Sequence, residues 1–164
     1  MSRVIFLDID GVLNSDFWNE SHQREISDGT LVDEEKVSLL AGLVKRTGAK
    51  IVLHSGWRYW FDRELKPLRP EAENLRRMLE KEKLAIEDIT PDHSTEEIRR
   101  DKTFSLVKAG EILAYLAAHE DVESWVVLDD LDLHSAEIEA RQIRTNPGVG
   151  LTPEDISKAE KLLH

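Results

Sequence analysis

The sequence predicts an α/β fold in which helices cover both faces of a mostly parallel sheet. Three short apolar segments, residues 4–7, 50–53 and 125–128, have the length and residue types of buried strands. Amphipathic helical segments separate them along the chain, and this order favours parallel pairing. Each segment ends abruptly in polar residues, which is typical of the ligand-binding edge of such a sheet.

The first third of the chain predicts a strand, a helix and a second strand. Residues 4–7 form an apolar run that opens into Asp8 and the polar residues after it. Between residues 33 and 47 the apolar side chains fall on one helical stripe, and Gly48 is placed to end the helix. The strand over residues 50–53 follows at once, so it should pair with the first strand in parallel.

The middle of the chain is more charged. Residues 59–83 are helix-prone, with Pro70 suited to a helix start. Residues 86–89 predict a short edge strand. The stretch from 90 to 103 is rich in charge and poor in apolar residues, so we expect a surface loop there.

The last part of the chain repeats the alternation. Residues 105–119 carry an apolar helical stripe, and the strand over residues 125–128 follows. A final short strand is expected over residues 142–145. Residues 152–155 predict the start of the last helix: Thr152 is suited to the cap, Pro153 to the first turn, and two acids follow.

Length and composition narrow the class of protein. A chain of 164 residues predicts one domain, with residues 59–104 as a small helical or loop insertion near the site. The absence of cysteine excludes disulfides, thiolate zinc sites and cysteine nucleophiles. The net charge of −11 works against general attraction to nucleic acid or anionic membrane. We expect a cytoplasmic protein with no membrane partner and no obligate protein partner, because the start lacks a signal-peptide pattern and no segment is long and apolar enough for a span.

Oxygen-bearing side chains and one cation gather at the predicted strand ends. They are Asp8, Asp10, Ser55, Asp129 and Asp130, with Lys108 near the start of the helix that precedes the last acidic pair. Converging carboxylates repel one another, so at neutral pH they need protonation or a cation among them. Hard oxygen ligands suit Mg²⁺, and two acids two residues apart on an extended backbone point to the same side.

The strings VIFLDIDGVL and IVLHS, a later lysine and WVVLDD resemble, in order, the four motifs of the haloacid dehalogenase-like (HAD) superfamily. The resemblance covers nearly the whole chain and implies a three-layer Rossmann-like fold with a five-stranded core. The strings HSGWR, IEDITP, KAGEIL and GLTPEDISKAEKLL further resemble a branch related to the HAD domains of RNA-repair proteins. No obvious cap domain interrupts the motifs, which favours larger or macromolecular substrates.

This resemblance implies roles for the gathered residues. Asp8 would attack phosphorus to form an aspartyl-phosphate, and Asp10 would be the general acid and base. The phosphate-binding set would be Ser55, Gly56, Arg58 and Lys108. The Mg²⁺ ligands would be Asp8, Asp10 through its backbone carbonyl, Asp129 and Asp130.

Several alternatives remain open at this point. Lys102 is a substitute for Lys108, because the usual proline after the lysine is missing. The sequence does not fix which of Asp129 and Asp130 binds metal directly. We leave His54 and His134 outside the set, because a lone histidine is more often structural.

The function predicted is that of a Mg²⁺-dependent phosphatase acting on a phosphorylated small molecule or a nucleic-acid end. The aromatic residues around Arg58 could stack on a base, and core packing explains them equally well. The alternatives are a non-catalytic phosphate- and metal-binding module, or a phosphotransferase that delivers the phosphoryl group to an alcohol.

Overall fold

The computed structural model describes residues 1–28 and 30–164 and contains a five-stranded sheet in the order β3-β2-β1-β4-β5. The strands are β1 (Ser2–Leu7), β2 (Lys50–Leu53), β3 (Ile86–Ile89), β4 (Val122–Asp129) and β5 (Gln142–Arg144). Every neighbouring pair is parallel. The predicted parallel sheet, its five-stranded core and the edge position of β3 are therefore confirmed.

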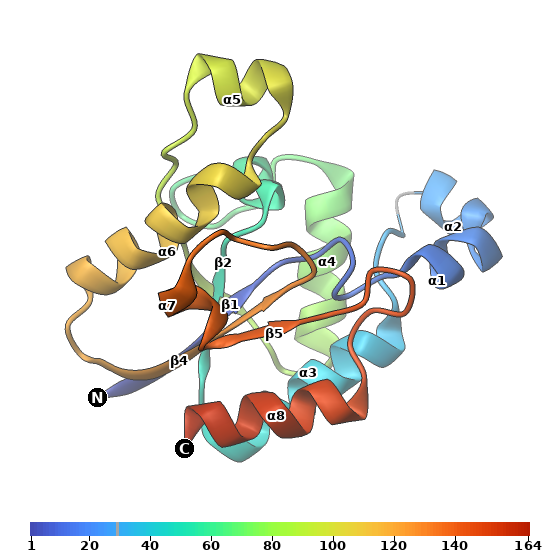
Figure 1. The fold of residues 1–164 in the computed structure, drawn as a ribbon. Coiled ribbons are helices and arrows are strands. Elements are labelled where there is room, and N and C mark those ends of the chain that lie inside the picture. The colour runs from blue at the N-terminus through green and yellow to red at the C-terminus, as the bar shows by residue number, and fades with distance from the viewer. Residues whose placement is uncertain (29) are drawn as a thin grey trace.

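Helices cover both faces of this sheet, as Figure 1 shows. One face carries α3 (Glu34–Thr47), α4 (Pro70–Lys81) and α8 (Pro153–Leu163); the other carries α6 (Ser105–Ala118) and α7 (Ala136–Glu139). Alternation along β1 explains the two layers, because Ile5 and Leu7 join the first core and Val4 and Phe6 the second. The three-layer α/β prediction is confirmed.

Four shorter helices lie in the connections: α1 (Asp16–Ser21), α2 (Gln23–Ser27), the 3₁₀ helix η1 (Gly56–Trp60) and α5 (Glu96–Asp101). The expectation of a loop from 90 to 103 was wrong in its middle, where α5 forms. Thr95 caps it by accepting a hydrogen bond from the Ile98 backbone N–H, with acids in the first turn and arginines in the last. These local signals outweigh the lack of apolar residues.

The helical stretch predicted over residues 59–83 is shorter in the structure. Helix α4 begins only at Pro70, the predicted start, and residues 61–69 form a turn held by an isolated bridge between Phe61 and Pro67. Within the described ranges, every helix is too short or too polar to span a bilayer.

Helix α8 begins at a complete capping box. The Thr152 hydroxyl accepts from the Asp155 backbone N–H, and the Asp155 carboxylate accepts from the Thr152 N–H, at 3.1 Å each. This helix packs on α3, β4 and β5, so its start also fixes the loop that precedes it.

Replacing Thr152 by alanine should therefore lower the free energy of unfolding by about 1 kcal/mol, because the Asp155 backbone N–H loses its acceptor. Urea unfolding followed by circular dichroism measures the change. Ser157→Ala, an exposed position in the middle of the same helix, is the matched control and should leave stability unchanged within about 0.5 kcal/mol.

Candidate active site

The register of the three central strands brings the site together. Leu7 lies opposite Leu53 on one side and Leu128 on the other, so the next residues, Asp8, His54 and Asp129, lie side by side where the strands end. By the alternation of the strands, these residues continue the face that α6 covers. Adjacency of Asp8 and Asp129 is thus a direct result of parallel pairing.

Lys108 reaches this cluster from α6. Its Nζ lies 2.9 Å from Asp129 Oδ2 and 3.7 Å from Asp8 Oδ2. The lysine is 7% exposed, which removes it from the surface role that lysines on amphipathic helices usually have. Lys102 instead lies exposed at the rim of the same pocket. The geometry favours Lys108 as the lysine that would meet a phosphoryl group at Asp8.

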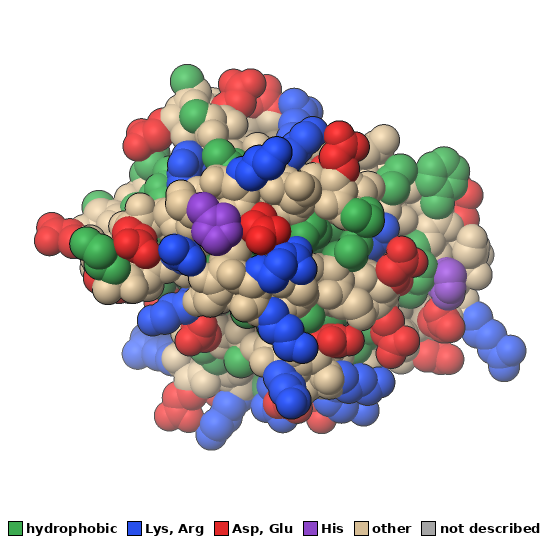
Figure 2. Space-filling model, turned by 90° about the horizontal axis from the view of Figure 1, so that it is seen from below, with side chains coloured by type: hydrophobic (Ala, Val, Ile, Leu, Met, Phe, Trp, Pro, Cys, Tyr) green, Lys and Arg blue, Asp and Glu red, His purple; other side chains and the backbone are tan. Residues whose placement is uncertain are grey.

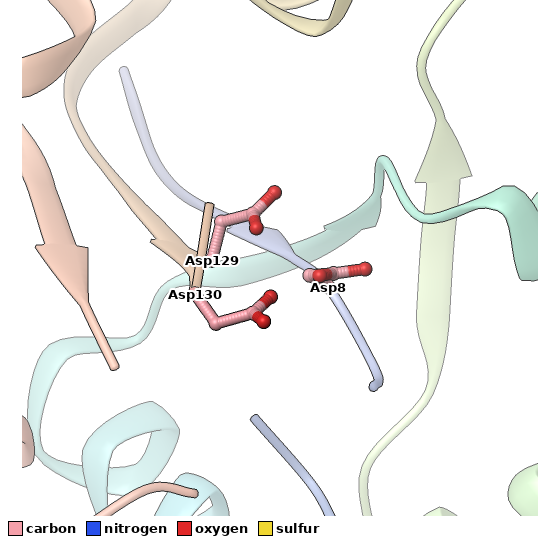
Figure 3. Close-up of side chains that lie close together, drawn as sticks. All are labelled: Asp8, Asp129 and Asp130. Carbon is pink, nitrogen blue, oxygen red and sulfur yellow. The ribbon is translucent and has the colours of Figure 1, made fainter. Parts of the chain in front are cut away.

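Asp130 completes a group of three carboxylates. One oxygen each of Asp8, Asp129 and Asp130 lies within 4.8 Å of the others, and the side chains point into a shared space (Figure 3). Asp129 is fully buried and its oxygens accept from several donors. Oδ2 accepts from His54 Nε2 at 2.8 Å and from Lys108 Nζ, and Oδ1 accepts from the Leu131 backbone N–H at 2.9 Å.

The protonation behaviour follows from these contacts. Burial raises the pKa of Asp8 well above its usual value, and the charge of Asp129 adds to this more than Lys108 removes. Burial and Asp129 likewise raise the pKa of Asp130. Asp129 is the exception: burial opposes its charge, yet hydrogen bonds from His54 and Lys108 hold its pKa below the usual range. The charges of Asp8 and Asp129 raise the pKa of Lys108 despite its burial.

The donor set fits a divalent cation. Three carboxylates and one ammonium group would carry an excess of two negative charges in a mostly buried space. Burial, together with the charge of Asp129, raises the pKa of both Asp8 and Asp130. Carboxylate oxygens are hard ligands of the kind Mg²⁺ prefers. Since Asp129 already accepts three hydrogen bonds, Asp8 and Asp130 have the freer oxygens.

His54, which the sequence analysis left out, belongs to the cluster. Burial lowers the pKa of His54, so the imidazole is neutral and its Nε2–H donates to Asp129. Its Nδ1 has no hydrogen-bond partner among the described residues. Nothing in its spacing distinguishes it from a structural histidine; only the strand register identifies it.

Asp10 lies in a turn, because β1 ends at Leu7 and the extended backbone assumed from its spacing stops there. Its two carboxylate oxygens accept from different segments: Oδ1 from Asn14 Nδ2 at 3.0 Å and Oδ2 from Trp57 Nε1 at 3.3 Å. The sequence analysis did not single out Asn14, and it considered Trp57 only as one of the aromatic residues around Arg58 that could stack on a base.

Ser55 caps η1: its Oγ accepts from the Trp57 backbone N–H at 3.1 Å. Since that bond uses the oxygen as acceptor, the hydroxyl hydrogen remains a donor for a ligand. Ser55 and Gly56 both line the pocket in front of Asp8.

Arg58 is held by protein groups. Its Nη2 lies 2.6 Å from Glu111 Oε2, and its Nη1 donates to the carbonyls of His54 at 2.8 Å and Ser55 at 3.1 Å. The guanidinium therefore fixes the backbone on either side of the candidate phosphate-binding serine. Direct contact of Arg58 with phosphate stays a prediction.

These groups open into a pocket of about 670 Å³. Asp8, Asp10, Ser55, Lys108 and Asp130 line it, while Asp129 is fully buried and does not line it. Its walls are largely aromatic, formed by Trp57, Tyr59, Trp60 and Phe104. The volume admits a group larger than a bare phosphate.

Gly11 makes the approach of Asp130 possible. Its φ is +80°, and a Cβ there would lie 2.7 Å from Asp130 Cγ. Gly11→Ala should lower the free energy of unfolding by about 2 kcal/mol or more and displace Asp130, thereby weakening Mg²⁺ binding. Thermal unfolding with and without Mg²⁺ measures both effects.

The matched control is Gly48→Ala. Gly48 has φ +70° but no atom within 4 Å of the added Cβ, so this variant carries the backbone strain alone. It should lose about 1 kcal/mol of stability and keep the full response to Mg²⁺. Equal behaviour of the two variants would contradict the role given to Gly11.

Asp8→Asn should raise the stability of the metal-free protein by about 1 kcal/mol or more. Because the folded-state pKa of Asp8 is raised, its charge opposes folding above that pKa, and this penalty disappears as the pH falls below the unfolded value. The gain should therefore be largest near neutral pH and shrink in acid. Chemical unfolding in a chelator at several pH values measures it.

Asp132→Asn serves as the comparison, because Asp132 is an exposed acid whose pKa is lowered by the His134 backbone N–H. That variant should gain no stability at any pH. A metal-free Asp8→Asn protein that is no more stable than wild type would argue against repulsion among the three carboxylates.

Comparison with known proteins supports the same assignment. The family model for the HAD domain in Swiss Army Knife RNA repair proteins matches residues 4–156, a range that includes every site residue described above. The comparison with curated proteins gave no match, nor did that with solved structures. The family match covers most of the chain and agrees with the parallel five-stranded fold. The chain therefore belongs to the family of HAD domains found in Swiss Army Knife RNA repair proteins, within the HAD-type hydrolases.

Proposed function

We propose that this protein is a Mg²⁺-dependent phosphatase that hydrolyses a phosphate monoester through an aspartyl-phosphate on Asp8. The observation that carries the proposal is the contact of Lys108 with both Asp8 and Asp129 at the end of the sheet, beside Asp130. A nucleophile, a counter-charge and a set of cation ligands then lie at the floor of one pocket.

In the first step an Asp8 carboxylate oxygen attacks phosphorus. The new bond joins that oxygen to phosphorus, the ester P–O bond breaks, and the departing oxygen takes a proton from Asp10. In the second step Asp10 takes a proton from water, and the water oxygen attacks phosphorus. The Asp8–phosphorus bond breaks, inorganic phosphate leaves, and both acids return to their starting states.

The phosphoryl oxygens need donors and positive charge throughout. Lys108 supplies an ammonium group next to the nucleophile, and the Ser55 hydroxyl supplies a hydrogen-bond donor. Gly56 lines the same wall, and Arg58 orders it through the Ser55 carbonyl. Mg²⁺, held by Asp8, Asp130, Asp129 and the Asp10 carbonyl, would neutralise negative charge on the phosphoryl group.

For the substrate we propose a nucleotide or a phosphorylated nucleic-acid end. Membership in a family of domains from RNA repair proteins supports this choice, and so do the aromatic residues that line the pocket, on which a base could stack. The net charge of −11 opposes broad electrostatic binding. On the face seen in Figure 2 basic and acidic side chains are interspersed, so recognition would depend on the pocket rather than on that face.

We also propose that part of the interval 59–104 acts as a small cover. Helix α5 stands beyond the main body of the fold in Figure 1, and Lys102 and Phe104, which follow it, line the pocket. The rest of the interval includes α4 and β3, which belong to the packed core. We therefore assign the cover to the segment around α5.

The test is phosphate release from a panel of monoesters that includes nucleotides, sugar phosphates and 3′- and 5′-phosphorylated oligonucleotides. We expect Mg²⁺-dependent turnover that a chelator abolishes and that Asp8→Asn lowers by about 10³-fold or more. Turnover of oligonucleotides should weaken as salt rises. Asp121→Asn is the matched control, because Asp121 is an exposed acid next to the opposite end of β4.

Two outcomes would contradict the proposal. Mg²⁺ and phosphate binding without Asp8-dependent turnover on any ester would indicate a binding module. Transfer of the phosphoryl group to an added alcohol in preference to water would indicate a phosphotransferase.

A further inference from the structure

We propose that Trp57 is a positioning residue for proton transfer: its indole N–H, together with the Asn14 amide, holds the Asp10 carboxyl in the orientation that faces the leaving oxygen. The inference rests on the proposed phosphatase reaction and assigns a role to a residue that the mechanism above does not use. It is based on the two hydrogen bonds that Asp10 accepts, from Asn14 and Trp57, and on the contacts that hold these two side chains in place.

Asp10 needs external support to keep one orientation. It lies in a turn after β1 and is an exposed residue, so packing does not hold its side chain. Its carboxylate instead accepts one hydrogen bond at each oxygen, from Asn14 Nδ2 at 3.0 Å and from Trp57 Nε1 at 3.3 Å. Two donors on opposite oxygens fix rotation about the bond to the carboxyl group, and each oxygen keeps a further lone pair for the proton it moves.

The Asn14 donor has only one possible orientation. Asn14 is 4% exposed, its Oδ1 accepts from the Gly11 backbone N–H at 3.0 Å, and its Nδ2 also donates to the Leu31 carbonyl at 2.8 Å. If the amide were flipped, its NH₂ group would face the Gly11 N–H and its oxygen would face the Leu31 carbonyl, so both hydrogen bonds would be lost. The turn that contains Asp10 therefore fixes the amide that orients it.

The Trp57 donor is equally constrained. Trp57 is 4% exposed, its backbone N–H donates to Ser55 Oγ at 3.1 Å, and its ring lies 4.7 Å from that of Trp60. One residue therefore contacts both the candidate phosphate-binding serine and the candidate general acid. The indole N–H is only a donor, so Trp57 can orient the carboxyl group but cannot carry the proton.

The role predicts a dependence on the leaving group. An alkoxide leaves poorly and needs the proton of Asp10 as the P–O bond breaks, whereas p-nitrophenolate leaves without much assistance. Loss of the indole N–H should thus slow alkyl esters selectively. A merely structural change in the pocket would slow both kinds of ester alike.

The test is Trp57→Phe, which keeps an aromatic ring and removes the N–H. With glycerol 2-phosphate, kcat should fall by about tenfold with little change in KM, while kcat for p-nitrophenyl phosphate should fall by less than about twofold. Asp10→Asn should give the same selectivity with a larger loss. Trp125→Phe, whose ring packs on Phe6 away from the pocket, should change neither ester.

Equal losses on both esters in Trp57→Phe, or no loss on the alkyl ester, would overturn the proposal. Wild-type protein without activity on any ester would instead refute the proposed function, and the contact is then tested by NMR. The Trp57 indole N–H, assigned among four tryptophans by its absence in Trp57→Phe, should shift upfield and exchange faster in Asp10→Ala. An unchanged indole signal would overturn the inference without any reference to turnover.

Discussion

The site depends on the burial of acidic side chains at the end of the sheet, compensated by Lys108. Parallel pairing of β1 with β4 forces Asp8 and Asp129 together, and burial makes their repulsion severe. The ammonium group of Lys108 lies against both. This contact agrees with the position of α6: the helix packs on the second core and carries Lys108, whose charge offsets those of Asp8 and Asp129.

A second buried ion pair connects η1, which follows Ser55, to the same helix. Arg58 of η1 meets Glu111 of α6 at 2.6 Å, one turn along from Lys108. The same guanidinium holds the carbonyls of His54 and Ser55, and Glu111 also accepts from the His93 backbone N–H. Helix α6 therefore contacts Asp8 through Lys108, and through Glu111 it supports the Ser55 loop and the start of the segment that leads to α5. The Nη donors of this arginine are thereby directed to protein acceptors.

Asp129 and Asp130 differ in role although they are neighbours in the sequence. Asp129 points into the α6 side, where His54 and Lys108 keep it ionised, and Asp130 faces the pocket next to Gly11. The charge of Asp129 raises the pKa of Asp8 and Asp130, whereas Asp130 remains accessible from the pocket. Alternation at the end of a strand is sufficient to produce this division.

The sequence by itself determined the alternation of strands and helices, the parallel sheet and most of the residues that gather at the candidate site. This was possible because apolar strands and their polar ends are local patterns, and parallel strands must place their carboxyl ends at one edge. It could not choose between Lys108 and Lys102, reveal the bond of His54 to Asp129, or show that Trp57 and Asn14 hold Asp10. The contacts of Lys108, His54 and Trp57 join segments separated by up to 75 residues, and they depend on strand register, helix rotation and side-chain rotamers. The contact of Asn14 lies within one turn and depends on the conformation of that turn. Helix α5 was missed for the opposite reason, because its capping signals are local but its composition resembles a loop. Only the packed tertiary structure decided which polar groups face one another, since hydrogen bonds require distances and directions that residue spacing does not contain.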